Sequence, residues 1–333
     1  MLWNRHVCAA EDGTRLDAFV GTHKSEWSRS DVRDAISEGR VRVDGKPRPK
    51  GFRVSTDQLI SIDPKKIESD ENSALDLVHV EDDWVVVAKK AGLPCHRVRH
   101  QEREALADQL THHFPEMKGI GYSSREAGLV HRLDIWTSGL LIAARTPKAF
   151  SRLREGLQSG DWEKRYFALC EGRIGSKPRW IDYPIDATGK RVIACRSEAQ
   201  ARQKNAQGAY TEIVSRIVGH ARSLLELRAT TACRHQIRVH LAAIGLPLVG
   251  DSLYGRDRES CSPKSNEGES HHLLHASLLE FTDPVSGARR RFFHSPCDRF
   301  EAALEQETAI AEGLRSLKPQ YGFTEAVVNA APG

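Results

Sequence analysis

The stretch Gly128-Leu-Val-His-Arg-Leu-Asp-Ile-Trp-Thr-Ser-Gly-Leu-Leu-Ile-Ala-Ala144 places a group of polar side chains between two apolar segments. This pattern predicts a strand, a loop and a second strand, with the side chains of the loop presented into a cleft. Gly139 closes the loop, and glycine adopts backbone angles that other residues avoid. Taken alone, the local pattern favours a simpler interpretation, an ordinary surface turn in which Arg132 pairs with Asp134.

The length and composition of the chain predict one large domain and one smaller domain. Of the 333 residues, 39% are hydrophobic, which is enough for substantial cores and too many for wholesale disorder. The formal net charge is only +4. Binding to a polyanion such as RNA therefore requires that the basic residues cluster.

Cysteine usage and hydropathy bear on the cellular compartment. The seven cysteines are scattered and form no C-x-x-C pair, which argues against a disulfide framework and against a zinc ribbon. No apolar run approaches the roughly 18 to 20 residues that span a bilayer, and the first residues lack the apolar segment of a signal peptide. We therefore expect a soluble protein of the reducing cytoplasm with no membrane partner.

The basic residues do cluster, near the amino terminus. Residues 14–20 and 28–39 have the apolar spacing of two short helices, and residues 41–43 and 58–62 resemble strands. Between them, six basic residues accompany a single acid, Asp44, a density suited to phosphate contacts, although a solvated basic face would look the same. The six are Arg40, Arg42, Lys46, Arg48, Lys50 and Arg53.

Two sets of motifs resemble known families. Arg15-Leu-Asp17, Ser28-Arg-Ser30 and Gly39-Arg-Val-Arg-Val-Asp-Gly-Lys46 resemble, in order, the alpha-L motif, a small RNA-binding module first recognised in a ribosomal protein. His131-Arg-Leu-Asp134 followed by Thr137-Ser-Gly139 resembles the catalytic signature of pseudouridine synthases of the RluA type. The second resemblance turns the central stretch from an ordinary turn into a candidate active-site loop.

Further motifs of the synthase family follow in order as far as about residue 300. Lys89-Lys-Ala-Gly-Leu-Pro94 resembles the family's Lys-Pro-Ala-Gly-Leu-Pro segment, and Lys164-Arg-Tyr-Phe-Ala-Leu-Cys-Glu-Gly172 resembles its second motif. The third motif begins at Thr231-Ala-Cys-Arg-His-Gln-Ile-Arg238 and continues to Gly255, where the family usually begins Thr-Gly-Arg-x-His-Gln-Ile-Arg. Cys233 in that motif and Trp136 in the central loop depart from the residues that are usual in the family.

The resemblance implies an α+β fold, as do the many strands with interspersed helices. It implies a large mixed, mainly antiparallel sheet with a central active-site cleft, preceded by a small α/β RNA-binding domain. We accordingly predict an amino-terminal extension over residues 1–13, the RNA-binding domain over 14–64, a linker over 65–76, the catalytic domain over 77–301, and a carboxy-terminal helix with a loose tail over 302–333.

The resemblance also implies an isomerase that converts specific uridines of structured RNA to pseudouridine, with ribosomal RNA favoured and transfer RNA as the alternative. Asp134 is the expected nucleophile or charge stabiliser, and whether it attacks the ribose or the base stays open. Arg238 is expected to keep Asp134 ionised, and Tyr166 to hold the uracil with its hydroxyl near carbon 5. Expected RNA-binding residues outside the basic cluster are Arg29, His131, Arg132, Arg234, His235 and Gln236.

The sequence shows no Gly-rich phosphate loop and no convincing set of metal ligands, so we expect no cofactor. The expected partner is RNA rather than DNA, and the expected state is a monomer. One alternative is an RNA-binding protein that keeps the fold with weak or no turnover, which Cys233 and Trp136 motivate. Another is a metal-dependent hydrolase that uses His271 and His275, but a core strand over residues 273–281 explains these histidines better.

Overall fold

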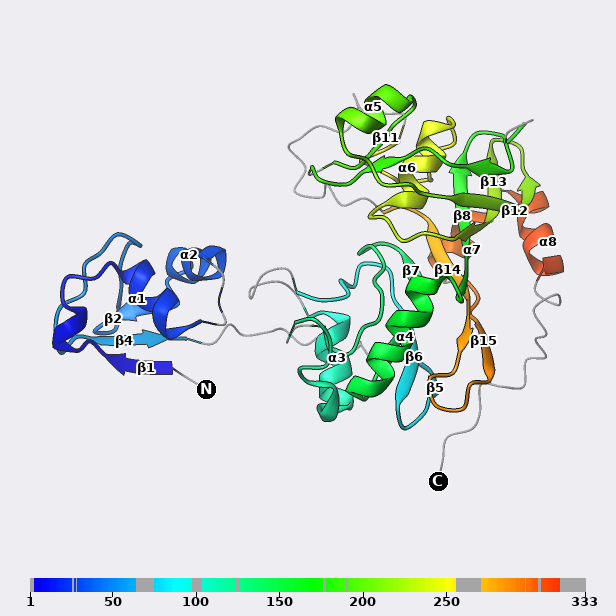
Figure 1. The fold of residues 1–333 in the computed structure, drawn as a ribbon. Coiled ribbons are helices and arrows are strands. Elements are labelled where there is room, and N and C mark those ends of the chain that lie inside the picture. Colours follow the sequence, from blue (N-terminus) through cyan, green and yellow to red (C-terminus); the bar gives the residue numbers. More distant parts are fainter. Residues whose placement is uncertain are drawn as a thin grey trace. The chain divides into compact units, whose positions relative to one another are not determined.

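The computed structural model describes residues 3–25, 27, 29–63, 75–97, 104–123, 126–175, 178–189, 191–255, 271–296, 298–304 and 307–317. The chain divides into two compact units, one of residues 1–74 and 96–109 and one of residues 75–95 and 110–333 (Figure 1). Within the described ranges, no helix combines the length and the apolar character that a membrane span requires. Each unit is described separately below.

The first unit is a four-stranded antiparallel sheet packed against two helices, as predicted. Apolar residues of both helices, including Leu16, Phe19 and Ile36, meet Val41 and Ile60 of the sheet in one core. The strands, in spatial order, are β1 (Trp3–His6), β4 (Leu59–Ile62), β2 (Val41–Val43) and β3 (Lys46–Pro47), and the helices are the 3-10 helix η1 (Ala9–Glu11), α1 (Leu16–His23) and α2 (Arg29–Ser37).

The predicted boundary at residue 14 requires a correction, because the preceding residues belong to this sheet. Trp3 to His6 pair with Ile62 to Leu59, and Val7 is buried in the common core. β1 is an edge strand whose side chains are mostly exposed, so it lacks the alternation of apolar and polar residues by which a half-buried strand is recognised. The predicted linker over residues 65–76 lies largely outside the described residues.

The second unit is built on a nine-stranded sheet. Its β7 and β14 run parallel, and the other pairs of its described strands are antiparallel, which confirms the predicted mixed, mainly antiparallel sheet. The spatial order is β5 (Leu77–Val80), β6 (Trp84–Lys89), β7 (Ser138–Ala144), β14 (Leu274–Thr282), β8 (Glu163–Glu171), β13 (Arg222–Ala229), β12 (Thr211–Val218) and β9 (Trp180–Ile181), with β15 (Arg289–Phe293) beside β14.

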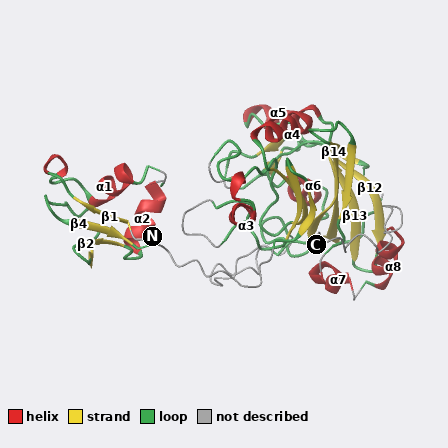
Figure 2. Ribbon diagram, turned by 90° about the horizontal axis from the view of Figure 1, so that it is seen from below, coloured by secondary structure: helices red, strands yellow, loops and turns green. Residues whose placement is uncertain are grey.

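Helices cover both faces of this sheet (Figures 1 and 2). On one face, α4 (Pro147–Ser159) packs on apolar residues of β7 and β14, and α6 (Gln236–Ala243) adjoins β12. On the other face, α7 (Asp298–Leu304) and α8 (Thr308–Leu317) pack on β8 and β13. The smaller elements of this unit are the 3-10 helix η2 (Pro115–Met117), α5 (Glu198–Gln203) and the strand pair β10 (Ile185–Asp186) and β11 (Ile193–Ala194). The division between the two units falls within α3 (Leu106–His113).

Local signals placed α4 correctly, but they did not place the end of the chain. The Thr146 hydroxyl accepts a hydrogen bond from the backbone of Ala149, and Gly160 ends α4 with a left-handed φ of 82°, as the cap, proline and glycine pattern predicts. The single helix predicted over 302–317 is instead two helices, α7 and α8. Just before α8, the Glu307 carboxylate accepts backbone N–H groups from the turn between β12 and β13.

Gly139 is required where β7 and β14 run side by side. Its φ is 106°, and a Cβ at this position would lie 2.2 Å from the carbonyl oxygen of Ala276 in β14. No other residue type fits this close approach of two backbones. The glycine therefore brings the loop over residues 131–137 to the middle of the sheet, next to β14 and β8.

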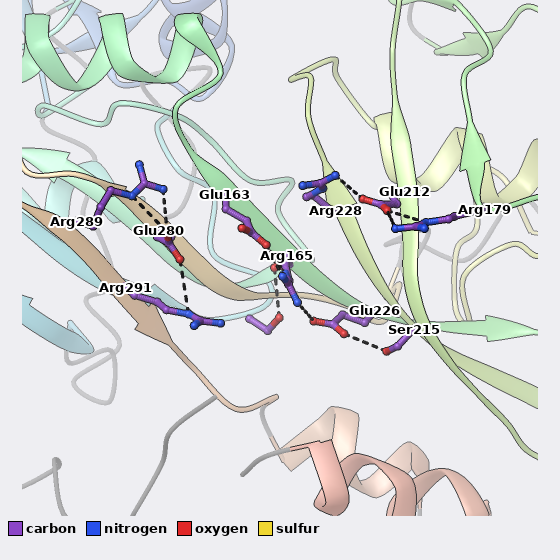
Figure 3. Close-up of polar contacts among 11 residues, drawn as sticks. Glu163, Arg165, Arg179, Glu212, Ser215, Glu226, Arg228, Glu280, Arg289 and Arg291 are labelled. Atoms are coloured by element: carbon purple, nitrogen blue, oxygen red, sulfur yellow. Dashed lines mark hydrogen bonds and ion pairs between the residues drawn. The ribbon is translucent and has the colours of Figure 1, made fainter. Parts of the chain in front are cut away.

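Charged side chains on the α7 and α8 face pair across neighbouring strands (Figure 3). Arg165 of β8 donates to Glu163 on its own strand and to Glu226 of β13, and Glu212 of β12 accepts from two arginines. Such cross-strand pairs each contribute roughly 0.2 to 1 kcal/mol and favour the observed register. The remaining members of the network in Figure 3 include Arg179, Ser215, Arg228, Glu280, Arg289 and Arg291.

Candidate active site

A cavity of about 410 Å³ lies on the α4 and α6 face, where the central loop meets β8 and the start of α6. All three predicted catalytic residues, Asp134, Tyr166 and Arg238, line it, although they are far apart in the sequence. The lining also includes five of the predicted RNA-binding residues, namely His131, Arg132, Arg234, His235 and Gln236. The prediction of a cleft around the central stretch is confirmed.

Asp134 is paired with Arg238, and Arg238 is in turn fixed by a second carboxylate. The Nη1 atom of Arg238 donates to Oδ2 of Asp134 at 3.1 Å. The Nε and Nη2 atoms of the same guanidinium donate to both oxygens of Asp251 at 2.8 and 3.0 Å, a bidentate geometry that restricts the orientation of the side chain. The backbone N–H groups of Leu253 and Tyr254 donate to Asp251 as well.

Electrostatic interactions favour the ionised forms of both Arg238 and Asp251. Burial raises the pKa of Asp251, but the hydrogen bonds and the charge of Arg238 more than offset this, so the pKa of Asp251 lies below its usual value. Burial lowers the pKa of Arg238, and the two carboxylates raise it further than burial lowers it. The guanidinium therefore remains charged beside Asp134, whose side chain is 21% exposed and opens onto the cavity.

Tyr166 remains protonated at neutral pH. It lies in the middle of the sheet on β8 and is 9% exposed. Burial raises the pKa of its hydroxyl, and the negative charge of Asp134 raises it further. The ring thus forms a flat, apolar wall of the cavity, and its hydroxyl is a hydrogen-bond donor rather than a base.

His235 lies against the central carboxylate. Its Nε2 atom is 3.8 Å from Oδ1 of Asp134, and its Nδ1 atom is 3.0 Å from the hydroxyl oxygen of Tyr254. Its φ is 54°, a left-handed value that is uncommon for a residue other than glycine. Burial lowers the pKa of His235. The sequence placed this residue among the contacts to RNA, whereas the structure places it beside Asp134.

The side-chain amide of Gln236 is fully hydrogen-bonded within the protein. Its Oε1 atom accepts from the hydroxyl of Thr231 and the backbone of Cys233, and its Nε2 atom donates to the Tyr210 carbonyl and to Thr211. These bonds use both donors and both lone pairs of the amide. The amide of Gln236 therefore positions the loop before α6, and its contact with RNA stays a prediction.

Sequence reasoning missed Asp251 and Tyr254 as parts of the site. The Tyr254 ring lies under Arg238, with the guanidinium carbon 5.2 Å from the ring centroid, and Asp251 is fully buried. Both residues stand near the end of the third motif, in Gly250-Asp-Ser-Leu-Tyr-Gly255. Membership in that motif was the available signal, but the pairing with Arg238 could not be read from it.

The Lys89-Lys-Ala-Gly-Leu-Pro94 segment is hydrogen-bonded to the central loop. The Lys89 side chain is 1% exposed, and its Nζ atom donates to the carbonyls of Lys90, Leu93 and Ile135 at 3.0, 2.8 and 2.9 Å. Cys95 exchanges hydrogen bonds with both backbone groups of Leu133. Lys89 and Cys95 therefore fix the backbone of Ile135 and Leu133, the two residues that flank Asp134.

Trp136 and the nearby histidines have packing roles. Trp136 stacks on His271 at 4.1 Å between ring centroids, and the Arg299 guanidinium lies 5.4 Å from its ring. His275 is buried in β14, where its Nδ1 atom is 2.9 Å from the hydroxyl of Ser138. Within the described ranges, no group of three or more His, Cys, Asp or Glu side chains could hold a metal ion. The strand interpretation of residues 273–281 is confirmed, and the metal-dependent hydrolase gains no support.

The basic cluster of the first unit splits into tied and exposed side chains. Arg40, whose side chain is 14% exposed, donates to Glu38, while Arg42 donates to Asp63 and Arg53 to the carbonyl of Gly13. Arg53 is nevertheless exposed, as are the remaining predicted residues Arg29, Lys46, Arg48 and Lys50. A hollow of about 450 Å³ is lined by Arg48, Lys50 and also Arg33, which the sequence had not singled out.

Comparisons with known proteins match both units. A family model described as RNA pseudouridylate synthase matches residues 83–243, and an S4 domain model matches residues 14–60. The chain is 33% identical to "Ribosomal large subunit pseudouridine synthase D" of Yersinia pestis over 84% of this chain and 87% of that protein. It is 32% identical to the protein of the same name from Vibrio cholerae over 91% and 93% of the two chains.

Solved structures show the same fold. The structure of "Human RNA Pseudouridylate Synthase Domain Containing 4" superposes with a TM-score of 0.54 at 22% identity, covering 69% of this chain and 92% of that one. That of "Human RNA Pseudouridylate Synthase Domain Containing 1" gives a TM-score of 0.51 at 23% identity, covering 73% and 95%. At these identities the likeness concerns the fold alone.

Proposed function

The chain belongs to the RNA pseudouridylate synthase family, and on that premise we propose that it converts uridines of large-subunit ribosomal RNA to pseudouridine through Asp134. The protein is an RNA-binding isomerase with an amino-terminal S4 domain. The proposed substrate follows from relatives that carry the name of ribosomal large subunit synthases. The observation that carries the proposed site is the ion pair of Asp134 with Arg238 inside a cavity that Tyr166 also lines.

The reaction breaks the bond between ribose and a ring nitrogen of uracil, rotates the base, and rejoins it through carbon 5. It needs a group that attacks or stabilises a reacting carbon, and an ionised carboxylate meets this need. Arg238 donates a hydrogen bond to the carboxylate of Asp134, and Asp251 keeps the guanidinium in place. Asp134 acts on either the ribose or the base, and the proposal covers both routes.

Tyr166 is proposed to hold the uracil by the face of its ring. A target base must leave its stack to reach an enclosed cavity, and aromatic rings replace the lost stacking. Because burial raises the pKa of the Tyr166 hydroxyl, this group is a poor base at neutral pH. We therefore assign the removal of the proton from carbon 5 to another group and restrict Tyr166 to positioning the base.

The finer points of the proposal concern partners and place. We propose a protein that acts as a monomer, on RNA rather than DNA, in the cytoplasm, with the predicted domain division as corrected at its amino-terminal end. A single chain supplies all of Asp134, Tyr166, Arg238 and Asp251, so the proposed site needs no residue from a second chain. The exposed Lys46, Arg48 and Lys50 of the S4 domain are the proposed contacts to RNA phosphates outside the cavity.

The test is a map of pseudouridine in total ribosomal and transfer RNA. The map is made for cells that lack the protein and for the same cells carrying either the wild type or Asp134→Ala. We expect particular uridines of the large-subunit RNA to lose modification in the null cells and to regain it only with the wild type. Identical maps would overturn the proposal and favour an RNA-binding protein without turnover, while changes confined to transfer RNA would overturn the substrate alone.

A further inference from the structure

Lys164 of β8 is buried in the wall of the cavity without a polar partner among the described residues. The residue is 8% exposed and lines the cavity, and within the part of the chain that the structure describes no residue forms a hydrogen bond or ion pair with its ammonium group. Burying a lone charge is unfavourable. Burial accordingly lowers the pKa of Lys164 to about 8. A buried ammonium group that lacks a negative partner is expected where the protein binds an anionic ligand.

The two residues adjacent to Lys164 in the sequence are both paired, in contrast to Lys164 itself. Glu163 and Arg165 point to the opposite face of β8, where both belong to the paired network of Figure 3. The same strand therefore neutralises its charges on one face and leaves a cation unpaired on the other. Stabilisation of the fold does not account for this difference, because an apolar side chain of similar size would fill the site at lower cost.

Two further groups with unused polar atoms lie around Lys164. The Nε2 atom of His131 and the Nε atom of Arg154 are buried and have no hydrogen-bond partner among the described residues. Burial, together with the nearby charges of Lys164 and Arg154, lowers the pKa of His131 to about 3. The Nη1 atom of Arg154 donates to the carbonyl of Val130 at 2.8 Å, which fixes the guanidinium. All three residues line the cavity.

The charge of the cavity favours an anionic ligand. Among the described residues that line it, Asp134 is the one acid, and it is already paired with Arg238. Lys164 and Tyr166 are two positions apart on β8 and face the same side, so they are separated by about 7 Å along the strand. A uridine whose base lies on Tyr166 would thus bring its backbone, not its base, near Lys164.

We infer that Lys164, together with Arg154 and His131, binds a backbone phosphate adjacent to the target uridine. The inference rests on the proposed function, since it assumes that the base of an RNA nucleotide enters this cavity. A phosphate supplies the negative charge that Lys164 lacks and several acceptors for the donors around it. Contacts of this kind position the nucleic acid without reading its sequence. The subsite would fix the flipped nucleotide relative to Asp134.

The first test compares Lys164→Met with Lys164→Arg in the Asp134→Ala background, where no turnover occurs. The control is Lys148→Met, which removes the same charge from an exposed position on α4 outside the cavity. Binding is measured at several salt concentrations with an RNA fragment that the wild type has been shown to modify. We expect Lys164→Met to weaken binding about 10- to 100-fold at low salt and to reduce the slope of log Kd against log salt by about 0.7 to 0.9. Lys164→Arg should keep most of the slope, and Lys148→Met should leave affinity and slope unchanged.

The second test identifies the phosphate. Each phosphate next to the target uridine is replaced in turn by an uncharged methylphosphonate. We expect one replacement to weaken binding by the protein with Lys164 and to have no further effect on Lys164→Met. An unchanged salt slope, or equal sensitivity of both proteins to every replacement, would overturn the inference. Thermal unfolding of Lys164→Met should match or exceed that of the protein with Lys164, since a lower melting temperature would indicate a structural role instead.

The two failures are distinguishable. A wild type that forms no pseudouridine in ribosomal RNA refutes the proposed substrate, and the binding experiments then use whichever RNA it does modify. A wild type that forms pseudouridine, with Lys164→Met indistinguishable from Lys148→Met, refutes the phosphate subsite alone.

Discussion

Replacing Asp251 with Asn tests whether the orientation of Arg238 is needed for catalysis. Asp251 is fully buried and accepts both Nε and Nη2 of Arg238, at 2.8 and 3.0 Å. Asn has nearly the same shape but carries one oxygen and no charge, so its amide would present a donor to a donor of the guanidinium. Asp251 is absent from the cavity lining, so the substitution acts on the reaction through the groups that Asp251 holds, which are Arg238 and the backbone of Leu253 and Tyr254.

The expected effects follow from these contacts. Removing one partner of a buried ion pair lowers the free energy of unfolding by about 3 to 5 kcal/mol. The lower end, about 3 kcal/mol, is expected here, because Asp134 remains 3.1 Å from Nη1 and Asn keeps one acceptor. A displacement of a catalytic group by about 1 Å costs roughly 100-fold in rate. We therefore expect kcat to fall about 100-fold with little change in KM.

The assay follows the release of tritium from uridine labelled at carbon 5, because pseudouridine formation removes that hydrogen. It is run below the melting temperature of the variant, so that the measured protein is folded. Ser252→Ala, at an exposed position in the same turn, is the matched control and should behave as the wild type. A folded Asp251→Asn protein with wild-type kcat would refute the reasoning, as would a loss confined to KM.

Other predictions concern the base, the protonation of the site and the junction of the sheet. Tyr166→Phe should keep kcat within about 10-fold of wild type, since only a donor is lost, whereas Tyr166→Leu should lower it by about 100-fold or more; full inactivity of the Phe variant would show that the hydroxyl transfers a proton. Because the pKa of Lys164 is about 8 in the folded protein and 10.5 otherwise, the unfolded state binds more protons between these values, and Lys164 should raise the free energy of unfolding with pH across that window by up to about 3 kcal/mol. Burial also lowers the pKa of Lys89 to about 8, so denaturant titrations of Lys164→Met should show a rise that is smaller by about 3 kcal/mol, and not its complete loss. Arg238 holds the pKa of Asp251 below its usual value, so the stabilisation by this pair should be complete above the unfolded pKa of about 4 and be lost as the pH falls through the folded pKa, and Asp251→Asn should flatten that acid limb. Gly139→Ala should cost about 3 kcal/mol or more by forcing β7 from β14, whereas Gly287→Ala, with φ of 73° and open space around it, should cost about 1 to 2 kcal/mol; equal costs in a denaturant titration would show that the close approach to Ala276 is not what matters.

Sequence motifs and patterns predicted those elements whose ends are fixed by residues close to them in the sequence. The cap at Thr146, the proline after it and Gly160 mark both ends of α4, because each acts on backbone groups within one turn. The sequence marked Gly139 as a position that needs glycine. It did not show that the requirement comes from the close approach of the β14 backbone. β1 escaped prediction because an exposed edge strand has no apolar alternation.

The identity of the catalytic residues followed from short motifs, and their arrangement did not. Asp134, Tyr166 and Arg238 were found by resemblance of the segments around them. The sheet order places β7, β14 and β8 side by side, which brings the loop of Asp134 to Tyr166 of β8. The packing of α6 beside β12 on the same face then brings Arg238 to Asp134 across 104 positions.

The sequence by itself therefore determined the two domains, most of the elements and the class of reaction, because turns, caps, apolar spacing and motif residues are properties of neighbouring positions. Only the tertiary structure decided that Asp251 orients Arg238, that internal hydrogen bonds use the whole side-chain amide of Gln236, and that Lys164 is buried with no polar partner among the described residues. Burial and pairing depend on which side chains from distant segments share a space. That information is absent from any single stretch of the chain.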